Sequence, residues 1–436
     1  MGMGSLALAS MLNEAHAAPF GRAKHVIHIF AAGGPSHVDT FDPKPELTRV
    51  DGKSVRGGAV AFGSPFKFER RGNSGIEVSE LFPKLGEHVD DMAIIRSLWT
   101  DIPDHGIASR FMNTGSTQLP KPSLGSWVLY GLGSGNKNMP GFVSLGGQPE
   151  WRQASFLPGH CQGVNVNYRP GMRPDEALLN IRSQFTPMDQ QRKQLDLANK
   201  LNALHSEKLQ RNEQLEARIE SFEMAFQMQT EATDAFDISK ESEATRALYA
   251  GIDPNAPRVR GSGRNGELGM KMLVARRLVE RGVRFVQINH GGWDHHNNLE
   301  TSLRQKCGEL DGPVAALLTD LKQRGLLNDT LILWGGEFGR TVTRDRNGNV
   351  GNAGRDHNGK AACCWMAGGG VKGGIVHGST DDLGAESVED KVHVHDLHAT
   401  ILALLGFDHT KLTFGYNGRD FRLTDNFGNV VKEVIA

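Results

Sequence analysis

Apolar residues along the chain gather in short runs that end in glycine-rich or polar loops. Residues 25–30 (HVIHIF) form such a run, and Gly33, Gly34 and Pro35 follow it, which predicts a buried strand and then a loop. Four more runs have the same character, at residues 92–95, 141–145, 283–288 and 330–334. Helical spacing of apolar residues lies between several of these runs. The alternation predicts an α/β fold with a largely parallel sheet.

The clearest unit of this pattern lies between residues 283 and 340. The strand predicted at 283–288 leads into a polar loop (HGGWDHHNN), and the strand predicted at 330–334 leads into a second polar loop (GGEFGR). Between them we expect a helix over 311–324, with Pro313 in its first turn and Gly325 just past its end. Ligands bind beyond the carboxyl ends of strands in open α/β sheets. Both loops are therefore expected to border a ligand site.

Residues 186–228 differ in kind from the rest of the chain. Thr186 and Pro187 suit a helix start, and leucines and phenylalanines then recur at mostly helical spacing with charges between them. The pattern predicts a long amphipathic helix or helix pair, part of an insertion at about 186–250 that packs on the sheet. A coiled-coil face for a partner is the alternative.

Composition excludes several classes of protein. Hydrophobic residues make up 38% of the 436, and the 53 glycines follow no Gly-X-Y period, which excludes collagen and most disordered chains. The 49 basic and 50 acidic residues give a net charge of −1. No long-range field then favours nucleic acid or an anionic membrane, so any anion site is local. No apolar run is long enough to span a membrane.

Cysteine and histidine usage narrows the chemistry of any metal site. The four cysteines include no C-x-x-C pair, which excludes a thiolate zinc site and a disulfide framework, and we expect them to be buried small apolar residues. Nine of the 17 histidines lie between residues 290 and 409. Histidines and carboxylates are therefore the expected metal ligands.

The N-terminal segment carries part of a targeting signal. Residues 3–12 are apolar, and Ala15-His16-Ala17 resembles a small-residue cleavage site, but no lysine or arginine precedes them. We expect an exported protein, in the periplasm or at the cell surface, whose signal is incomplete. A poorly ordered tail on a cytoplasmic protein is the alternative.

Metal-ligating residue types cluster in the two polar loops. His290, Asp294 and His296 lie within seven residues of one loop, and an extended Asp-x-His segment points both side chains the same way. Imidazole with carboxylate suits zinc, manganese or iron. Glu337 follows the other strand and is expected to be a ligand. The alternatives are a solvated loop and, for Glu337, an ion pair with Arg340 or a helix N-terminal acid.

Further candidates lie elsewhere along the chain. His357 adds a possible ligand, and Arg355 beside it can receive an anion bidentately. His37 and Asp39, after the first predicted strand, are expected to contact metal or substrate, with turn chemistry as the alternative. Arg110 can clamp an anion.

A third histidine-rich segment covers residues 393–398 (HVHDLH). His393 and His395 share one face if the segment is extended, and one of them can reach the metal site. Asp396 is placed to cap the following helix.

Four stretches together resemble a large bacterial family, the domain of unknown function 1501. They are HVIHIFAAGGPSHVDTFDPKPEL, HGGWDHHNN, TLILWGGEFGRT, and GRDHNGK with HVHDLHATILALLG. That family is placed in the alkaline phosphatase and sulfatase superfamily, and its members often carry a twin-arginine signal. The resemblance implies one alkaline-phosphatase-like domain over residues 21–436. Its fold would be a three-layer sandwich with a mostly parallel sheet and a metal site at the strand ends.

The superfamily's site residues carry over unevenly. Asp294 and His296 resemble one metal-binding element and His357 the later closing histidine, but Phe338 stands where a second ligand is usual after Glu337. No acid ends the first strand. His105 stands at the nucleophile position instead of Ser, Thr or Cys, and it can equally be a ligand or a general acid. The sulfatase Cys-x-Pro-x-Arg signature is absent.

These observations support two hypotheses. The first is a hydrolase of phosphate or sulfate esters, small or on a polysaccharide, that depends on a divalent ion: zinc, manganese, calcium or magnesium. His105 would be nucleophile or acid/base, and Arg110, Arg340 or Arg355 would hold the anion. The second is a non-catalytic relative that binds an anionic ligand or a glycan.

Overall fold

The computed structural model describes residues 21–118, 120–136, 138–169, 176, 186–208, 226, 234–249, 266–345 and 352–436. The signal-like segment at 1–20 lies outside the described residues. A nine-stranded sheet crosses the molecule in the order β12-β4-β11-β8-β1-β7-β5-β6, with β15 also paired to β4. Its strands are β1 (His25–Phe30), β4 (Met92–Trp99), β5 (Phe142–Leu145), β6 (Val164–Asn165), β7 (Phe285–Asn289), β8 (Thr330–Gly335), β11 (Ala362–Ala367), β12 (Ile375–His377) and β15 (Val392–His393).

Every strand of this sheet except β11 runs in one direction, because β11 alone pairs antiparallel with its neighbours β4 and β8. The predicted α/β fold with a mostly parallel sheet is confirmed. The carboxyl ends of β1, β4, β7 and β8 therefore lie at one edge of the sheet.

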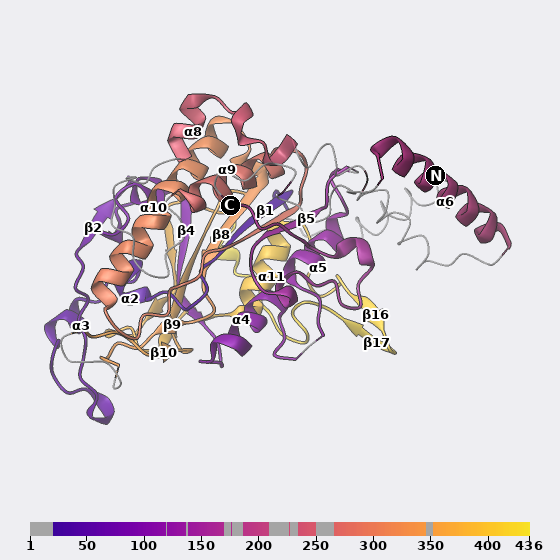
Figure 1. Ribbon diagram of the computed structural model, residues 1–436. Helices are drawn as coiled ribbons and strands as arrows, with labels where there is room; N and C mark the ends of the chain where they lie inside the picture. Colours follow the sequence, from indigo (N-terminus) through magenta and orange to yellow (C-terminus); the bar gives the residue numbers. More distant parts are fainter. Residues whose placement is uncertain are drawn as a thin grey trace.

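Helices cover both faces of the sheet, giving three layers (Figure 1). On one side lie α8 (Glu243–Tyr249), α9 (Glu267–Glu280) and α10 (Leu299–Gln323), and on the other α4 (His105–Thr114), α5 (Leu124–Leu132) and α11 (Val394–Leu404). Further α-helices within the described residues are α2 (His37–Thr40), α3 (Pro45–Arg49) and α6 (Met188–Lys208). Short strand pairs are β2 (Phe68–Arg71) with β3 (Ile76–Ser79), β9 (Gly339–Arg340) with β10 (His357–Asn358), β13 (Ser379–Thr380) with β14 (Ser387–Glu389), and β16 (Phe414–Tyr416) with β17 (Arg419–Phe421).

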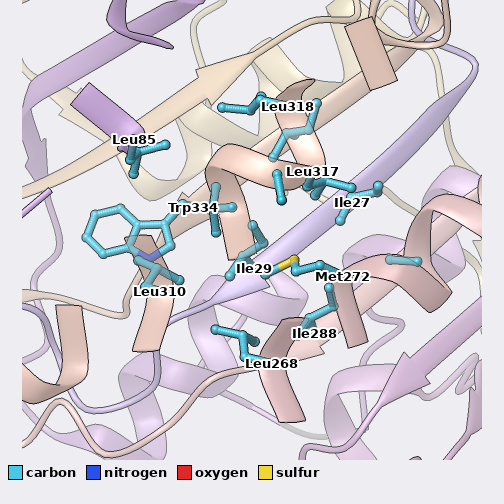
Figure 2. Close-up of a cluster of buried hydrophobic side chains, with 14 of the residues drawn as sticks. Ile27, Ile29, Leu85, Leu268, Met272, Ile288, Leu310, Leu317, Leu318 and Trp334 are labelled. Atoms are coloured by element: carbon cyan, nitrogen blue, oxygen red, sulfur yellow. The ribbon is translucent and has the colours of Figure 1, made fainter. Parts of the chain in front are cut away.

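Alternation along β1 explains why both faces are covered. Ile27 and Ile29 point to the α9–α10 side, whereas Val26 and Phe30 belong to the core on the α4–α5–α11 side, and all four are fully buried. Figure 2 shows the first of these cores, where β1, β7 and β8 meet leucines of α9 and α10. A strand buried on both faces is the reason that its sequence reads as a continuous apolar run.

The helix after the HGGWDHHNN loop is longer than predicted. It begins at Leu299 rather than near residue 311, and Pro313 lies inside it rather than in its first turn. Leu303, Cys307 and Leu310 are fully buried along the added turns. Burial of this stripe offsets the hydrogen bond that an interior proline removes.

Two further expectations need correction and one is confirmed. Leu197 and Leu201 on α6 are 59% and 57% exposed, so this helix does not bury its apolar residues on the sheet as expected (Figure 1), whereas Phe236 and Tyr249, later in the predicted insertion, are buried in the core on the α9–α10 side. Asp396 is not the cap of α11. His393 is, and Asp396 accepts the His393 backbone N–H at 2.8 Å to complete a capping box. All four cysteines are buried and free, as expected. No helix in the described part of the chain is long and apolar enough to cross a membrane.

Candidate metal centre

Three histidines and an aspartate converge at the carboxyl edge of the sheet. His105 is the first residue of α4, reached from the end of β4; Asp294 and His296 lie in the loop after β7. His357 is brought back to this edge because β10 pairs with β9, opposite Arg340. One ligand atom from each of the four residues lies within 4.8 Å of every other. The structure thus brings together candidates that are separated by up to 252 residues, the interval from 105 to 357.

Asp294 lies at the middle of this group, which we call the His3Asp cluster (His105, Asp294, His296, His357). Its Oδ1 is 3.1 Å from His105 Nε2, 2.9 Å from His296 Nε2 and 3.4 Å from His357 Nε2. The Nε2 atoms of His296 and His357 are 3.0 Å apart. Tetrahedral zinc with ligands at 2.0–2.1 Å places its ligand atoms about 3.3 Å from one another. The observed spacing is close to that value.

Each histidine of the cluster is held through its other ring nitrogen. The Nδ1 partners are Glu337 Oε1 at 2.6 Å for His105, Asp345 Oδ2 at 2.5 Å for His296 and the Pro103 carbonyl at 2.8 Å for His357. Carboxylates and carbonyls accept hydrogen bonds, so the network assigns the proton of each neutral ring to Nδ1. The Nε2 lone pairs then face one another. This is the arrangement by which metal-ligating histidines are oriented in proteins.

The charge around the cluster also fits a cation. Asp294, Glu337 and Asp345 bring three carboxylates against the single guanidinium of Arg340. Glu337 is 2% exposed, and its Oε2 is buried without a hydrogen-bond partner. A buried carboxylate oxygen left unpaired is costly. A divalent cation among these groups would balance the surplus negative charge.

Protons take up part of that surplus in the cation-free protein. Burial lowers the pKa of His105, but its hydrogen bonds to Asp294 and Glu337 and their negative charges outweigh burial and raise that pKa to about 9. Burial raises the pKa of Asp294, yet hydrogen bonds from His105 and Arg340 outweigh it and hold that pKa well below its usual range. At neutral pH His105 therefore carries the positive charge that the carboxylates attract.

Arg340 positions the cluster and is not free to hold a substrate anion as expected. It is 1% exposed, and its guanidinium donates to the carbonyls of Gly33, Gly34 and Arg355 as well as to Asp294. Its Nη1 also lies 3.5 Å from His296 Nε2. These contacts fix Asp294 beside the end of β1. They leave few donors for an external ligand.

Glu337 lies beside the four-residue group rather than within it. Its Oε1 accepts the Gly33 backbone N–H at 2.9 Å in addition to the bond from His105. Only the other oxygen, Oε2, is therefore available for the expected role as a metal ligand. Phe338 packs its ring 4.8 Å from the rings of both His105 and His357, and it supplies an apolar wall where a second ligand was missing.

Asp39 and Arg355 form a fully buried ion pair away from the cluster. Both side chains are 0% exposed, and Arg355 donates to Asp39 through Nε at 2.7 Å and Nη2 at 3.0 Å. His37, also expected as a ligand, bonds the Gly384 carbonyl through Nε2 at 2.7 Å. Neither His37 nor Asp39 is a member of the His3Asp cluster, and the Arg355 guanidinium donates to Asp39 and to the Thr341 carbonyl. The alternative reading for residues 36–39, local structure, describes this segment better.

Two remaining candidates also lie apart from the cluster. His290 is buried, with Nε2 3.3 Å from Glu309, and burial lowers its pKa. Its partner is on α10 rather than in the loop. Arg110 donates to the Thr117 carbonyl at 3.1 Å. Sequence reasoning missed Asp345 and Pro103, which orient two of the histidines. Asp345 stands in an Arg- and Asn-rich segment with no local pattern that marks it.

Comparison with known proteins gives three kinds of result. No curated protein matches this chain. Similar solved structures include Ps i-CgsB in complex with k-i-k-neocarrahexaose (12% identity, 88% of this chain and 72% of that chain, TM-score 0.40). They also include the lipoteichoic acid synthase LtaP from Listeria monocytogenes (9%, 95% and 80%, 0.37) and the alkaline phosphatase from the Antarctic bacterium TAB5 (10%, 89% and 99%, 0.36).

The third result concerns the family. A family profile described as "Protein of unknown function (DUF1501)" matches residues 23–435, which is nearly the whole chain and includes every residue of the His3Asp cluster. The match agrees with the four stretches that carried the resemblance in the sequence. The chain therefore belongs to the DUF1501 family.

Proposed function

We propose that this protein is a metal-dependent hydrolase of phosphate or sulfate esters that uses water as the nucleophile. One observation carries the proposal: three imidazole Nε2 atoms and a carboxylate, each fixed from behind, converge at the carboxyl edge of a parallel sheet. Such a set suits zinc or manganese better than calcium or magnesium, which prefer oxygen ligands. A divalent ion held by these residues would supply Lewis acidity toward an ester oxygen.

His105 is assigned as a ligand rather than the nucleophile. Its Nδ1 is bound to Glu337 and its Nε2 faces Asp294, so neither ring nitrogen is free to form a covalent bond with a substrate. None of the four clustered groups is a hydroxyl or a thiol. Water is therefore the nucleophile that we assign.

Glu337 is the proton acceptor that we assign to this water. Its Oε2 is buried and unpartnered, and the opposite oxygen is tied to His105 and to the Gly33 backbone N–H. A fixed carboxylate with one free oxygen can take a proton as the water attacks. The N-terminus of α4, which begins at His105, adds a partial positive charge that favours an anionic ester.

The test is to load the purified protein with zinc or manganese and assay aryl phosphates and aryl sulfates. We expect a rate that depends on the metal and falls below detection in His296→Ala. At saturating metal, Glu337→Gln should lose about 100-fold in kcat because the proton acceptor is removed. Its metal affinity should fall by about tenfold, because the carboxylate that accepts the His105 Nδ1–H loses its charge. A rate that is the same with metal and with chelator, or the same in His296→Ala, would overturn the proposal.

A non-catalytic anion- or glycan-binding protein is the second candidate. The observation that favours it is that none of the four clustered groups is a hydroxyl or a thiol, so the cluster itself offers no side chain that could form a covalent intermediate. Glu337→Gln distinguishes the two, since a binding protein has no turnover to lose. We also propose that the protein is exported, which cell fractionation tests. A single domain over residues 21–436 is a further prediction, which limited proteolysis tests.

A further inference from the structure

A cavity of about 830 Å³ lies on the face of the sheet that α4 and α11 cover (Figure 1). It opens between the C-terminal end of α4, the start of α11 and the β16–β17 hairpin, and none of the four cluster residues lines it. His393 and His395, one of which was a candidate for the metal site, line this cavity instead. Its volume is in the range of pockets that hold small organic ligands.

Aromatic rings form much of the cavity wall. His395 stacks on Phe427 with ring centroids 5.2 Å apart and planes 4° from parallel, and Trp99 packs against His393 at 4.7 Å. Phe427 is nevertheless 62% exposed. A large aromatic side chain held in place by stacking but open to solvent offers an apolar face to a ligand.

Two ring nitrogens of this wall lack hydrogen-bond partners. His395 donates from Nε2 to the Gly115 carbonyl at 2.9 Å, so its buried Nδ1 is an acceptor without a donor; the side chain is 5% exposed. His393 accepts the His395 backbone N–H at Nδ1, so its Nε2 is a donor. That Nε2 lies 3.4 Å from Asp101 without hydrogen-bond geometry. The two rings lie 5.2 Å apart, and a hydroxyl group can pair with either nitrogen because it both donates and accepts.

The charges that line the cavity nearly cancel. The lining holds three carboxylates (Asp101, Asp396 and Asp425) and two cations (Lys121 and Arg419), a formal charge of −1. Arg419 pairs with Asp425, and Asp396 accepts the backbone N–H at the start of α11. A lining with one negative charge in excess disfavours an anionic ligand and carries no strong field for a cation. Aromatic faces, paired hydroxyl partners and balanced charge together describe a site for a neutral polyhydroxylated ligand.

We propose that this cavity binds neutral sugar units of a glycan. The cavity and the metal centre share a wall, because Asp101 and Ile102 line the cavity and the next residue, Pro103, orients His357. A glycan held here would present an ester toward the cluster. Presentation of an ester to the cluster rests on the proposed hydrolase function. The binding of sugar in the cavity does not depend on it.

Trp99 makes the binding measurable. It is half-buried, whereas the other five tryptophans are buried, so collisional quenching by iodide reports mainly on this residue. The probes are neutral linear hexasaccharides of glucose, galactose, mannose and xylose, each titrated to about 10 mM to cover weak affinities. We expect at least one to protect the fluorescence in a saturable way. Phe427→Ala should weaken that sugar about fivefold to tenfold through lost stacking.

The matched control is Leu197→Ala, which removes an equally exposed apolar side chain far from the cavity, on α6, and should leave the affinity unchanged. Trp99→Phe tests the source of the signal. This variant should still bind the sugar in a calorimetric titration but should no longer show the protection of fluorescence from iodide. If none of the four hexasaccharides gives saturable protection, or if Phe427→Ala binds as tightly as the wild type, the proposal is wrong.

The metal-centre variant His296→Ala separates this proposal from the proposed function. His296→Ala should keep the sugar affinity of the wild type. Sugar binding by a wild-type protein that hydrolyses no aryl phosphate or sulfate with zinc or manganese would support the cavity and contradict only the hydrolase. An active hydrolase that binds no hexasaccharide would overturn only the cavity.

Discussion

The contact between Asp345 and His296 offers the sharpest test of how the metal centre is built. Asp345 Oδ2 lies 2.5 Å from His296 Nδ1, and its side chain is 2% exposed. A hydrogen bond to a charged group contributes about 1.5–3 kcal/mol, against about 0.5–1.5 for a neutral one. Asp345→Asn keeps a bond but removes the charge, so the orientation and basicity of His296 should weaken by about 1.5 kcal/mol. That corresponds to about a tenfold loss of metal affinity.

The assay is a competition titration with a chromophoric chelator, with circular dichroism to confirm that the variant is folded. Asp356→Asn is the matched control, since Asp356 lies 4.0 Å from the same Nδ1 and its side chain is 59% exposed. We expect its metal affinity to stay within about twofold of the wild type. Equal affinities for the wild type and Asp345→Asn, in a folded protein, would refute the role of Asp345.

Three further predictions concern the cluster and its surroundings. The pKa of His105 is about 9 in the folded protein and 6.5 in the unfolded chain, so protonated His105 stabilises the fold fully below pH 6.5 and ceases to do so as the pH rises through 9. The Tm of the protein in chelator should therefore fall between pH 6.5 and 9, and the Tm of His105→Gln should not. Arg340→Lys should reduce the free energy of unfolding in urea by about 2 kcal/mol, because one ammonium cannot pair with Asp294 and every carbonyl that the guanidinium reaches. Asp39→Asn should destabilise by about 3 kcal/mol, since it leaves the buried Arg355 charge uncompensated, and should leave metal affinity unchanged, whereas a ligand would alter it.

The local pattern of apolar residues predicted several strands of the sheet correctly. β1 occupies the predicted residues 25–30, and β8 extends the predicted run at 330–334 by one residue, because each is an apolar run that ends at glycine. β11 was not among the predicted strands, although its cysteines were expected to be buried. An apolar run flanked by a long glycine loop carries no mark of its antiparallel pairing with β4 and β8.

The metal centre was only partly predictable. Asp294, His296 and His357 were chosen for their residue types and loop positions, yet what brings His357 to the others is the pairing of β9 with β10, which no local pattern reveals. The same limit explains Asp39, whose partner Arg355 lies 316 residues away. A carboxylate in a buried ion pair and a carboxylate that binds a metal look alike in sequence, and only tertiary contacts separate them.

Metal content measured together with local structure tests the central claim most directly. The protein should be reconstituted with zinc, dialysed, and examined by elemental analysis and X-ray absorption at the zinc edge, with His296→Ala treated in parallel. We predict about one zinc per chain, coordinated mainly by nitrogen at about 2.0–2.1 Å, with most of it lost in the variant. A wild type that retains no metal, or a variant that retains as much with the same spectrum, would contradict the assignment of the His3Asp cluster.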